Sequence, residues 1–262
     1  MTTVSHPGDL FEILHDATKL VPGHDEAFRS RVGFYNSSEE GRDYIASAYK
    51  KYVGYPEVEL TAAALPSSAI SDCLLKRTSV RKFSGEPVSI EDLSTLLHLA
   101  YGSDRGSSGE ATGFVLPKRP YPAAGGLYSI ECYPILLRTT GVASGVCHYS
   151  RYEQKLRKLA EAPAVEALRD IFNIPEALAN SAGIAIVHTS NPQRVSKKYG
   201  LRGRHFAAVE MGLATQSLLV AATAVNLSSV VWGGYYDREV EDLLGIDGIE
   251  EIVATVTFVG KE

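Results

Sequence analysis

The stretch from residue 205 to residue 226 is the sequence feature that most constrains the fold. It is apolar around most of a helical circumference, and it is interrupted by Glu210, Gln216 and threonines. An uninterrupted apolar span is the pattern that crosses a membrane, whereas an apolar helix with internal polar residues belongs in a protein core. The sequence therefore predicts a long, buried central helix, of a kind that often lies at a dimer interface.

Helical and strand patterns alternate on both sides of this helix. Ser89 begins a Ser-x-x-Asp cap before apolar residues at helical spacing, and Gly102 ends that helix. Strands are expected at 130–138, 145–149, 182–188, 228–232 and 252–259, and further helices at 152–160, 163–172 and 237–244. This order predicts an α+β fold, with a central mixed β-sheet flanked by helices.

The 262 residues suit one large domain with an appended segment. Residues 1–70 read as an N-terminal extension that ends at a Leu-Pro-Ser-Ser break, and residues 71–262 form the main domain. Residues 102–113 are rich in glycine and serine and predict a surface loop, which is either a substrate lid or a linker.

Composition excludes several functional classes. A net charge of -5, without a long basic stripe, argues against a nucleic-acid partner. Cys73, Cys132 and Cys147 lack metal-ligand spacing and are an odd count, so neither a zinc site nor a disulfide framework is expected. The N-terminus lacks the pattern of a signal peptide, and a cytoplasmic protein without a membrane span is expected.

A glycine hinge between aromatic residues occupies residues 119–133. Gly125 and Gly126 lack a Cβ and can bring backbone against a flat ligand, while tyrosines on both sides supply planar walls. Gly233 and Gly234 follow a predicted strand among aromatics and repeat this arrangement. The competing interpretations are an ordinary loop at the first pair and a tight turn at the second.

Two clusters of polar residues are candidates for binding and chemistry. Arg77, Ser79 and Arg81 alternate and would share one side of an extended chain, where they form a phosphate cradle or a solvated basic edge. Lys198 and Tyr199 lie in a basic segment before the long helix, as a candidate acid/base pair or part of a basic surface loop. No Rossmann fingerprint or P-loop is present.

Taken in order, these segments resemble the SagB-type dehydrogenases, a branch of the FMN-dependent nitroreductase superfamily that includes the azoline oxidases of peptide natural-product pathways. The matching elements are HDATK at residues 15–19, RTSVRKF at 77–83, PAAGGLY at 122–128 and KYG at 198–200. Ala123 and Ser129 depart from a serine and a proline of the family pattern, and Leu213 stands where a histidine is frequent.

The resemblance implies an FMN site. Residues 77, 79 and 81 would hold the FMN phosphate and the pyrimidine edge of the ring, Lys261 would approach the phosphate, and the two glycine pairs would lie against the flavin. Gln216 falls in a stretch like the family's Gln-Asn pair, in which Ser217 replaces the asparagine. The superfamily usually builds its flavin sites across a homodimer interface.

The resemblance also implies a reaction. Lys198 or Tyr199 would remove the Cα proton of a thiazoline or oxazoline in a peptide, with hydride transfer to flavin N5 and reoxidation by oxygen. The alternatives are an FMN oxidoreductase that acts on a carrier-bound peptide, a diketopiperazine, or a nitro or quinone acceptor with NAD(P)H. A third alternative is a non-catalytic subunit among the partner proteins of a peptide-modifying complex.

Overall fold

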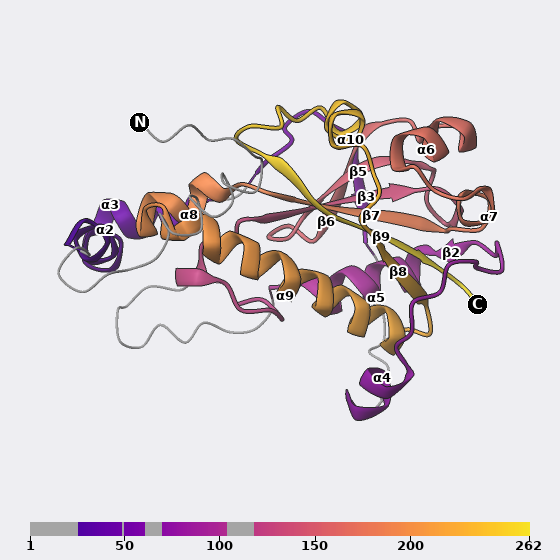
Figure 1. The fold of residues 1–262 in the computed structure, drawn as a ribbon, viewed down its shortest axis with the longest axis horizontal. Coiled ribbons are helices and arrows are strands. Elements are labelled where there is room, and N and C mark those ends of the chain that lie inside the picture. The colour runs from indigo at the N-terminus through magenta and orange to yellow at the C-terminus, as the bar shows by residue number, and fades with distance from the viewer. Residues whose placement is uncertain (1–25, 49, 61–69, 104–117) are drawn as a thin grey trace, which may run out of the picture.

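A seven-stranded antiparallel sheet forms the centre of the fold (Figure 1). The structure is a computed structural model, and it describes residues 26–48, 50–60, 70–103 and 118–262. The spatial order of the main sheet is β1-β6-β5-β3-β7-β9-β8. Its strands are β1 (Glu57–Glu59), β3 (Ile130–Leu136), β5 (Gly145–Ser150), β6 (Lys155–Ala160), β7 (Ile184–Ser190), β8 (Ser228–Trp232) and β9 (Ile252–Gly260). Among the described residues, parallel pairing occurs only between the short strands β2 (Val88–Ser89) and β4 (Thr139–Thr140), and at a Ser79–Ser229 bridge.

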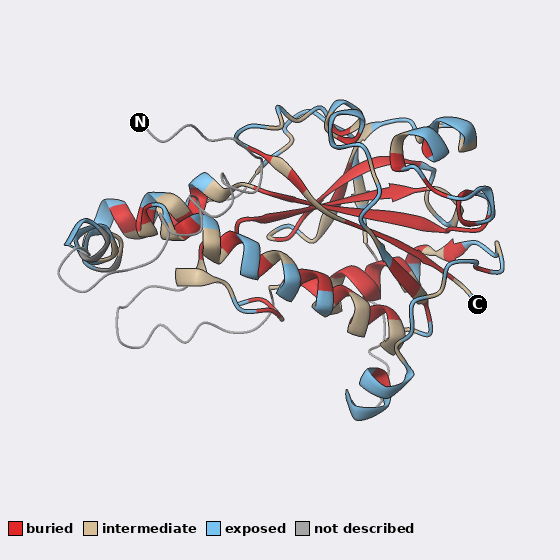
Figure 2. Cartoon of the chain, in the orientation of Figure 1, coloured by how far each residue is buried: buried red, intermediate tan, exposed pale blue. Residues whose placement is uncertain are grey.

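Helices cover both faces of the sheet, and buried apolar side chains line the contacts (Figure 2). One face carries α5 (Ile90–Tyr101) and α9 (Arg202–Ala224), and the other carries α6 (Val165–Phe172), α7 (Glu176–Ala179) and α10 (Asp237–Leu244). These layers confirm the predicted α+β class, although the described strands of the main sheet pair antiparallel where a mixed sheet was predicted. The predicted cap of α5 is also confirmed, because the Ser89 hydroxyl accepts a hydrogen bond from the Asp92 amide at 3.0 Å.

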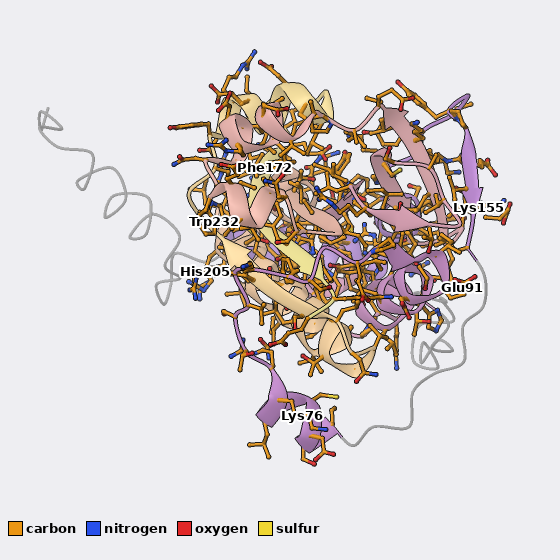
Figure 3. The ribbon with its side chains drawn as sticks, turned by 90° about the vertical axis from the view of Figure 1, so that its right-hand side faces the viewer. Lys76, Glu91, Lys155, Phe172, His205 and Trp232 are labelled. Carbon is orange, nitrogen blue, oxygen red and sulfur yellow. The ribbon has the colours of Figure 1, made fainter. Side chains whose placement is uncertain are left out.

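The N-terminal extension contributes to both the sheet and the helical layer. Its described elements are α2 (Glu26–Ser37), α3 (Glu39–Ser47) and β1, with α4 (Ile70–Lys76) at its boundary. Helices α2 and α3 lie beside α8 (Pro192–Tyr199), at the end of the molecule where α9 begins (Figure 1). Helix α4 projects from the lower side of the molecule, near the end of α9, and carries Lys76 (Figures 1 and 3). The HDATK motif and most of the glycine-rich loop lie outside the described residues.

The predicted helix at 152–160 is wrong, because residues 155–160 form strand β6 between β5 and β1. This segment contains good helix formers, but tertiary pairing overrides their local preference. Lys155 donates to Glu57 at 2.9 Å and to Glu59 at 2.8 Å, and Arg157 donates to Glu57 at 2.7 Å. The charged side chains of Lys155 and Arg157 therefore form cross-strand ion pairs with β1.

The long helix α9 is central, but it is buried along only part of its circumference. Ala214, Leu218 and Ala222 face the core, whereas Val209 is 50% and Leu213 37% exposed. Among the described residues it is the one helix that is long and apolar enough to cross a membrane, a test that core helices also pass. The predicted burial therefore applies to the inner face of α9, whereas apolar side chains on its outer face are exposed in the single chain.

Candidate functional site

The glycine hinge and the Lys-Tyr pair, which are far apart in the sequence, are in contact in the structure. Gly125, in the short helix η1 (Ala124–Gly126), has a φ of +60°. A Cβ at this position would lie 2.6 Å from Tyr199 Oη and 3.0 Å from Lys198 Nζ. Gly126 has a φ of +70° and Tyr128 a φ of 48°, so the hinge is a left-handed turn that favours glycine. The absence of a side chain at Gly125 leaves space for the functional ends of the pair.

Helix α8 presents the pair at its C-terminal end. The side chain of Asn191 caps its first turn by accepting from the Arg194 amide at 3.2 Å, and Gly200 ends the helix with a φ of +60°. Lys198 is buried and Tyr199 is half-buried. The Tyr199 ring packs edge-on against Phe206 of α9, with ring centroids 5.1 Å apart.

Burial shifts the pKa values of Lys198 and Tyr199 in opposite directions. It lowers the pKa of the Lys198 ammonium, because a charged amine loses solvation inside the protein. It raises the pKa of the Tyr199 phenol for the same reason. The shift of the Lys198 pKa is thus in the direction expected of a base, whereas the shift of the Tyr199 pKa is opposite to the expected one. Burial increases the neutral fraction of the amine and keeps the phenol protonated.

Two buried glutamates hold the strand that leaves the hinge, and sequence reasoning missed both. Glu210 of α9 accepts from the Ser129 hydroxyl at 2.8 Å, the Ser129 amide at 3.0 Å and the Ile130 amide at 3.4 Å. A proline at position 129 would supply neither Ser129 donor. The departure at Ser129 is thus part of a three-bond attachment of the hinge to α9, and the apolar surroundings of Glu210 hid this role in the sequence.

Glu131, the second glutamate, is the centre of a buried ionic cluster. It accepts from Arg194 at 2.7 Å and from Arg151 and His148 at 3.2 Å each. Burial acts to raise the pKa of Glu131, but the charges of Arg194 and His148 outweigh it and lower this pKa to about 2. Glu131 is therefore ionised, and it joins β3 to α8. The sequence signal was a lone glutamate inside an otherwise apolar strand.

The predicted phosphate cradle lies along the other edge of the sheet. The Val80 amide donates to the Ser229 carbonyl at 3.1 Å, and the Ser84 amide donates to the Lys261 carbonyl at 2.8 Å. These bonds place the Arg77–Arg81 segment beside strand β8 and the end of β9. Within the part of the chain that the structure describes, the side chains of the two arginines make no hydrogen bond or ion pair. The cradle therefore offers unpaired cationic groups.

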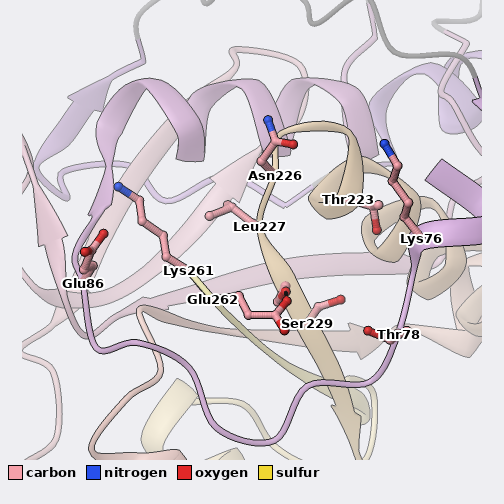
Figure 4. Close-up of a pocket in the computed structure, with 10 residues that line it drawn as sticks. Lys76, Thr78, Glu86, Thr223, Asn226, Leu227, Ser229, Lys261 and Glu262 are labelled. Carbon is pink, nitrogen blue, oxygen red and sulfur yellow. Dashed lines mark hydrogen bonds between the residues drawn. The ribbon is translucent and has the colours of Figure 1, made fainter. Parts of the chain in front are cut away.

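A cavity of about 380 Å³ opens beside this segment (Figure 4). Lys76 and Lys261 lie on opposite sides of it, and Thr78 and Ser229 also line it. Its lining does not include Arg77, Ser79 or Arg81, which alternate with Lys76 and Thr78 along the chain. The structure thus brings Lys261 to this segment but places it in a cavity with the intervening residues.

The remaining predicted cofactor residues are Gly233 and Gly234, which follow β8, and Gln216 of α9. Gly233 has open space where a Cβ would be, and a Cβ at Gly234 would lie 3.2 Å from Trp232 Nε1. Gln216 is on the exposed face of α9, where it lines a cavity of about 480 Å³ together with Tyr121 and Leu213. This cavity extends from the hinge segment along the outer face of α9.

One chain therefore contains two separate groups of candidate residues. The Lys-Tyr pair and Gly125 lie where α9 begins, whereas Lys261 and Ser229 share a cavity with Thr223 and Asn226 where α9 ends. The 23 residues of α9 correspond to about 34 Å of α-helix. A single mononucleotide cofactor does not span that distance.

Comparison with known proteins identifies the family. The nitroreductase family model matches residues 74–261, which is most of the chain. The chain belongs to the nitroreductase family. This family assignment covers the hinge, the cradle, the Lys-Tyr pair and the C-terminal strand, and it supports an oxidoreductase. It does not distinguish the SagB-type branch within the family.

Two relatives and one solved complex are similar to this nitroreductase in sequence or fold. A protein of Methanocaldococcus jannaschii named as a nitroreductase is 27% identical over 72% of this chain and 90% of its own length. The microcin B17-processing protein McbC of Escherichia coli is 27% identical over 66% of this chain and 62% of its length. The E. coli microcin synthetase McbBCD complex with truncated pro-MccB17 bound matches with a TM-score of 0.59 at 22% identity, over 97% of this chain and 92% of the matched chain.

A second solved structure is a crystal structure from Anabaena variabilis, which is also described as a nitroreductase. It matches 98% of this chain with a TM-score of 0.72 and 22% identity. This chain spans 49% of the Anabaena chain, about half of its length. At this identity the likeness concerns the fold, and it extends the nitroreductase arrangement to the described N-terminal elements.

Proposed function

We propose that this nitroreductase-family protein is an FMN-dependent dehydrogenase that converts thiazoline or oxazoline rings of a peptide into thiazoles or oxazoles. The observation that carries the proposal is the contact of Lys198 and Tyr199 with Gly125, because it puts a base candidate against the hinge. The similarity to the microcin B17-processing protein supports a peptide as the substrate class. Partner proteins of a peptide-modifying assembly are part of this proposal.

The residues at the far end of α9 fit FMN. Proteins of this family typically bind this cofactor. Lys261 lines the cavity at this end and suits a phosphate, and the unpaired guanidinium groups of Arg77 and Arg81 belong to the segment beside that cavity. The open space over Gly233 suits a flat ring. Bound FMN would supply a two-electron acceptor for hydride. The protein's own groups would then orient the substrate and handle its proton.

Lys198 is the proton acceptor in this mechanism. A buried amine with a lowered pKa has a larger neutral fraction near pH 7 and can take the Cα proton of the azoline. Tyr199 remains protonated, and its hydroxyl, in contact with the same hinge, donates a hydrogen bond that orients the ring. The hinge and the ring of Phe206 restrict water around the pair.

A homodimer would complete the site. The distance along α9 separates the cofactor residues from the pair in one chain, and the outer face of α9 exposes Val209 and Leu213. A two-fold axis that places two α9 helices antiparallel brings the beginning of one helix to the end of the other. Each active site would then take Lys198 from one copy and the phosphate cradle from its partner.

The direct test combines the FMN-loaded protein with peptides that contain one thiazoline or one oxazoline. The expected result is the oxygen-dependent loss of two hydrogens from the ring, followed by mass spectrometry. Rapid NADH or NADPH oxidation with a nitro or quinone acceptor, without ring oxidation, would instead identify a reductase. A protein that stays colourless with excess FMN would exclude both activities.

A mixing experiment tests the shared site. One variant carries Lys198→Ala and Tyr199→Phe, and the other carries Arg77→Gln and Arg81→Gln. Each homodimer is expected to be inactive, but a heterodimer retains one site with both sets intact, so an equal mixture should recover about a quarter of wild-type turnover. Absence of recovery, when exchange of subunits is verified, would contradict a site built from two chains.

A further inference from the structure

The helix that carries Lys198 is attached to the hinge at a second point. Arg194 Nη1 donates to the Tyr128 carbonyl at 2.8 Å and to Glu131 Oε1 at 2.7 Å. Tyr128 comes three residues after Gly125, which contacts Lys198. Residues four apart on an α-helix lie on the same face, and Arg194 and Lys198 are both buried on that face of α8. The two contacts therefore join the same two segments one helical turn apart.

Glu131 fixes the arginine in this position. Its carboxylate is 2% exposed, and it also accepts from Arg151, which donates to the Ile130 carbonyl and to Tyr121 Oη at 3.3 Å. The arginines of the cluster thus donate hydrogen bonds to the backbone carbonyls on both sides of Ser129, just after the glycine hinge. Both bonds of Arg194 come from Nη1, whose two N–H groups are fixed in the guanidinium plane, whereas the N–H groups of a lysine ammonium rotate and define the geometry less.

We propose that Arg194, held by Glu131, is a positioning residue that sets the register of α8 on the hinge and thereby places Lys198 Nζ against Gly125. Its effect on turnover rests on the proposed function of Lys198 as the base. Its effect on the location of the Lys198 amine is independent of the reaction. Arg194 itself touches the hinge carbonyl and Glu131, and it acts through Lys198.

The test uses the full-length, FMN-supplied protein with Arg194→Lys and, separately, Glu131→Asp. Both variants keep the opposite charges but weaken the attachment, one from each side. Arg138→Lys is the matched control, because Arg138 also donates to backbone carbonyls, those of Ala179 at 3.1 Å and Ala182 at 3.0 Å, away from α8. Thermal unfolding and flavin absorbance verify that each protein is folded and loaded.

Two readouts are measured. The first is the acylation rate of Lys198 by a small amine-reactive reagent, followed by peptide mass spectrometry with the exposed neighbour Lys197 as the internal reference. It should rise severalfold in both attachment variants and stay at the wild-type level in the control. The second is steady-state turnover of the azoline peptide, in which kcat should fall about a hundredfold with little change in KM, because a misplacement near 1 Å has that effect.

The outcomes separate the two proposals. Folded Arg194→Lys and Glu131→Asp proteins with wild-type Lys198 acylation overturn the positioning role, and so does wild-type kcat on an azoline that the unmodified protein oxidises. If the unmodified protein oxidises no azoline, the proposed function fails, and the acylation ratio alone decides whether Arg194 places the lysine. A raised ratio in either folded variant supports the inference.

Discussion

Substitution of Gly125 by alanine tests the contact on which the proposed chemistry depends. The new methyl carbon would lie 2.6 Å from Tyr199 Oη and 3.0 Å from Lys198 Nζ. Contacts of this kind are comfortable at about 3.5 Å or more, so Tyr199 Oη must retreat by about 1 Å and Lys198 Nζ by about 0.5 Å. A misplacement near 1 Å can lower turnover by about a hundredfold, so the smaller movement of the lysine is expected to lower it by about tenfold or more. The φ of +60° adds about 1–2 kcal/mol of backbone strain.

Gly245→Ala is the matched control for the strain. Gly245 has a φ of +68°, and a Cβ there meets nothing within 4 Å. Both variants should lose similar stability, about 2–4 °C in Tm for each kcal/mol, whereas only Gly125→Ala should lose turnover of an azoline peptide at saturating substrate. Thermal unfolding and rapid-quench mass spectrometry measure the two effects. Equal turnover in the two variants would refute the assignment of the pair to the hinge.

Three further predictions concern the pair, the cradle and the core. The double variant Lys198→Ala, Tyr199→Phe should bind FMN and be yellow but should not oxidise the ring, and unchanged turnover would contradict the role of the pair. In the wild-type protein, kcat should rise with pH through a pKa below the ordinary lysine value, because burial lowers the pKa of Lys198. Arg77→Gln or Arg81→Gln should weaken FMN binding on the order of tenfold in a fluorescence titration. Burial lowers the pKa of His188 to about 4, so the unfolded chain protonates first as pH falls below 6.5. Urea titrations should show the free energy of unfolding falling by about 1.4 kcal/mol per pH unit in this window, and His188→Asn should remove that slope.

Local signals predicted the elements in which sequence pattern and packing agree. The Ser89 cap and the apolar spacing after it located α5, since a side-chain cap is a local interaction. The segment at 155–160 failed because its partners, Glu57 and Glu59, are a hundred residues away and belong to the extension. A strand that is stabilised by charges on a distant partner strand need not show the local alternation of apolar and polar residues from which strands are predicted.

The candidate site was predictable as motifs but not as an arrangement. Gly125 and Lys198 were each recognisable from residue type, but their contact depends on how α8 packs against the hinge. The roles of Glu131, Arg194 and Glu210 were not predicted because each stands alone among apolar or helical neighbours, and buried charges are informative only when their partners are known. A polar residue on an otherwise buried strand is the signal that could have identified Glu131.

The apolar circumference of α9 reflects two different surfaces. Its inner face packs on α5 and the sheet, while Val209 and Leu213 remain exposed in one chain. The same helix separates the Lys-Tyr pair from Lys261 by its full length. A second copy of the chain packed on α9 would explain both the exposed apolar face and the separation of the two groups of site residues. In such a dimer, dissociation of the two copies separates the base from the phosphate cradle. Dilution of the protein below its dimer affinity should then release FMN and abolish turnover together, because neither half of the site is complete alone.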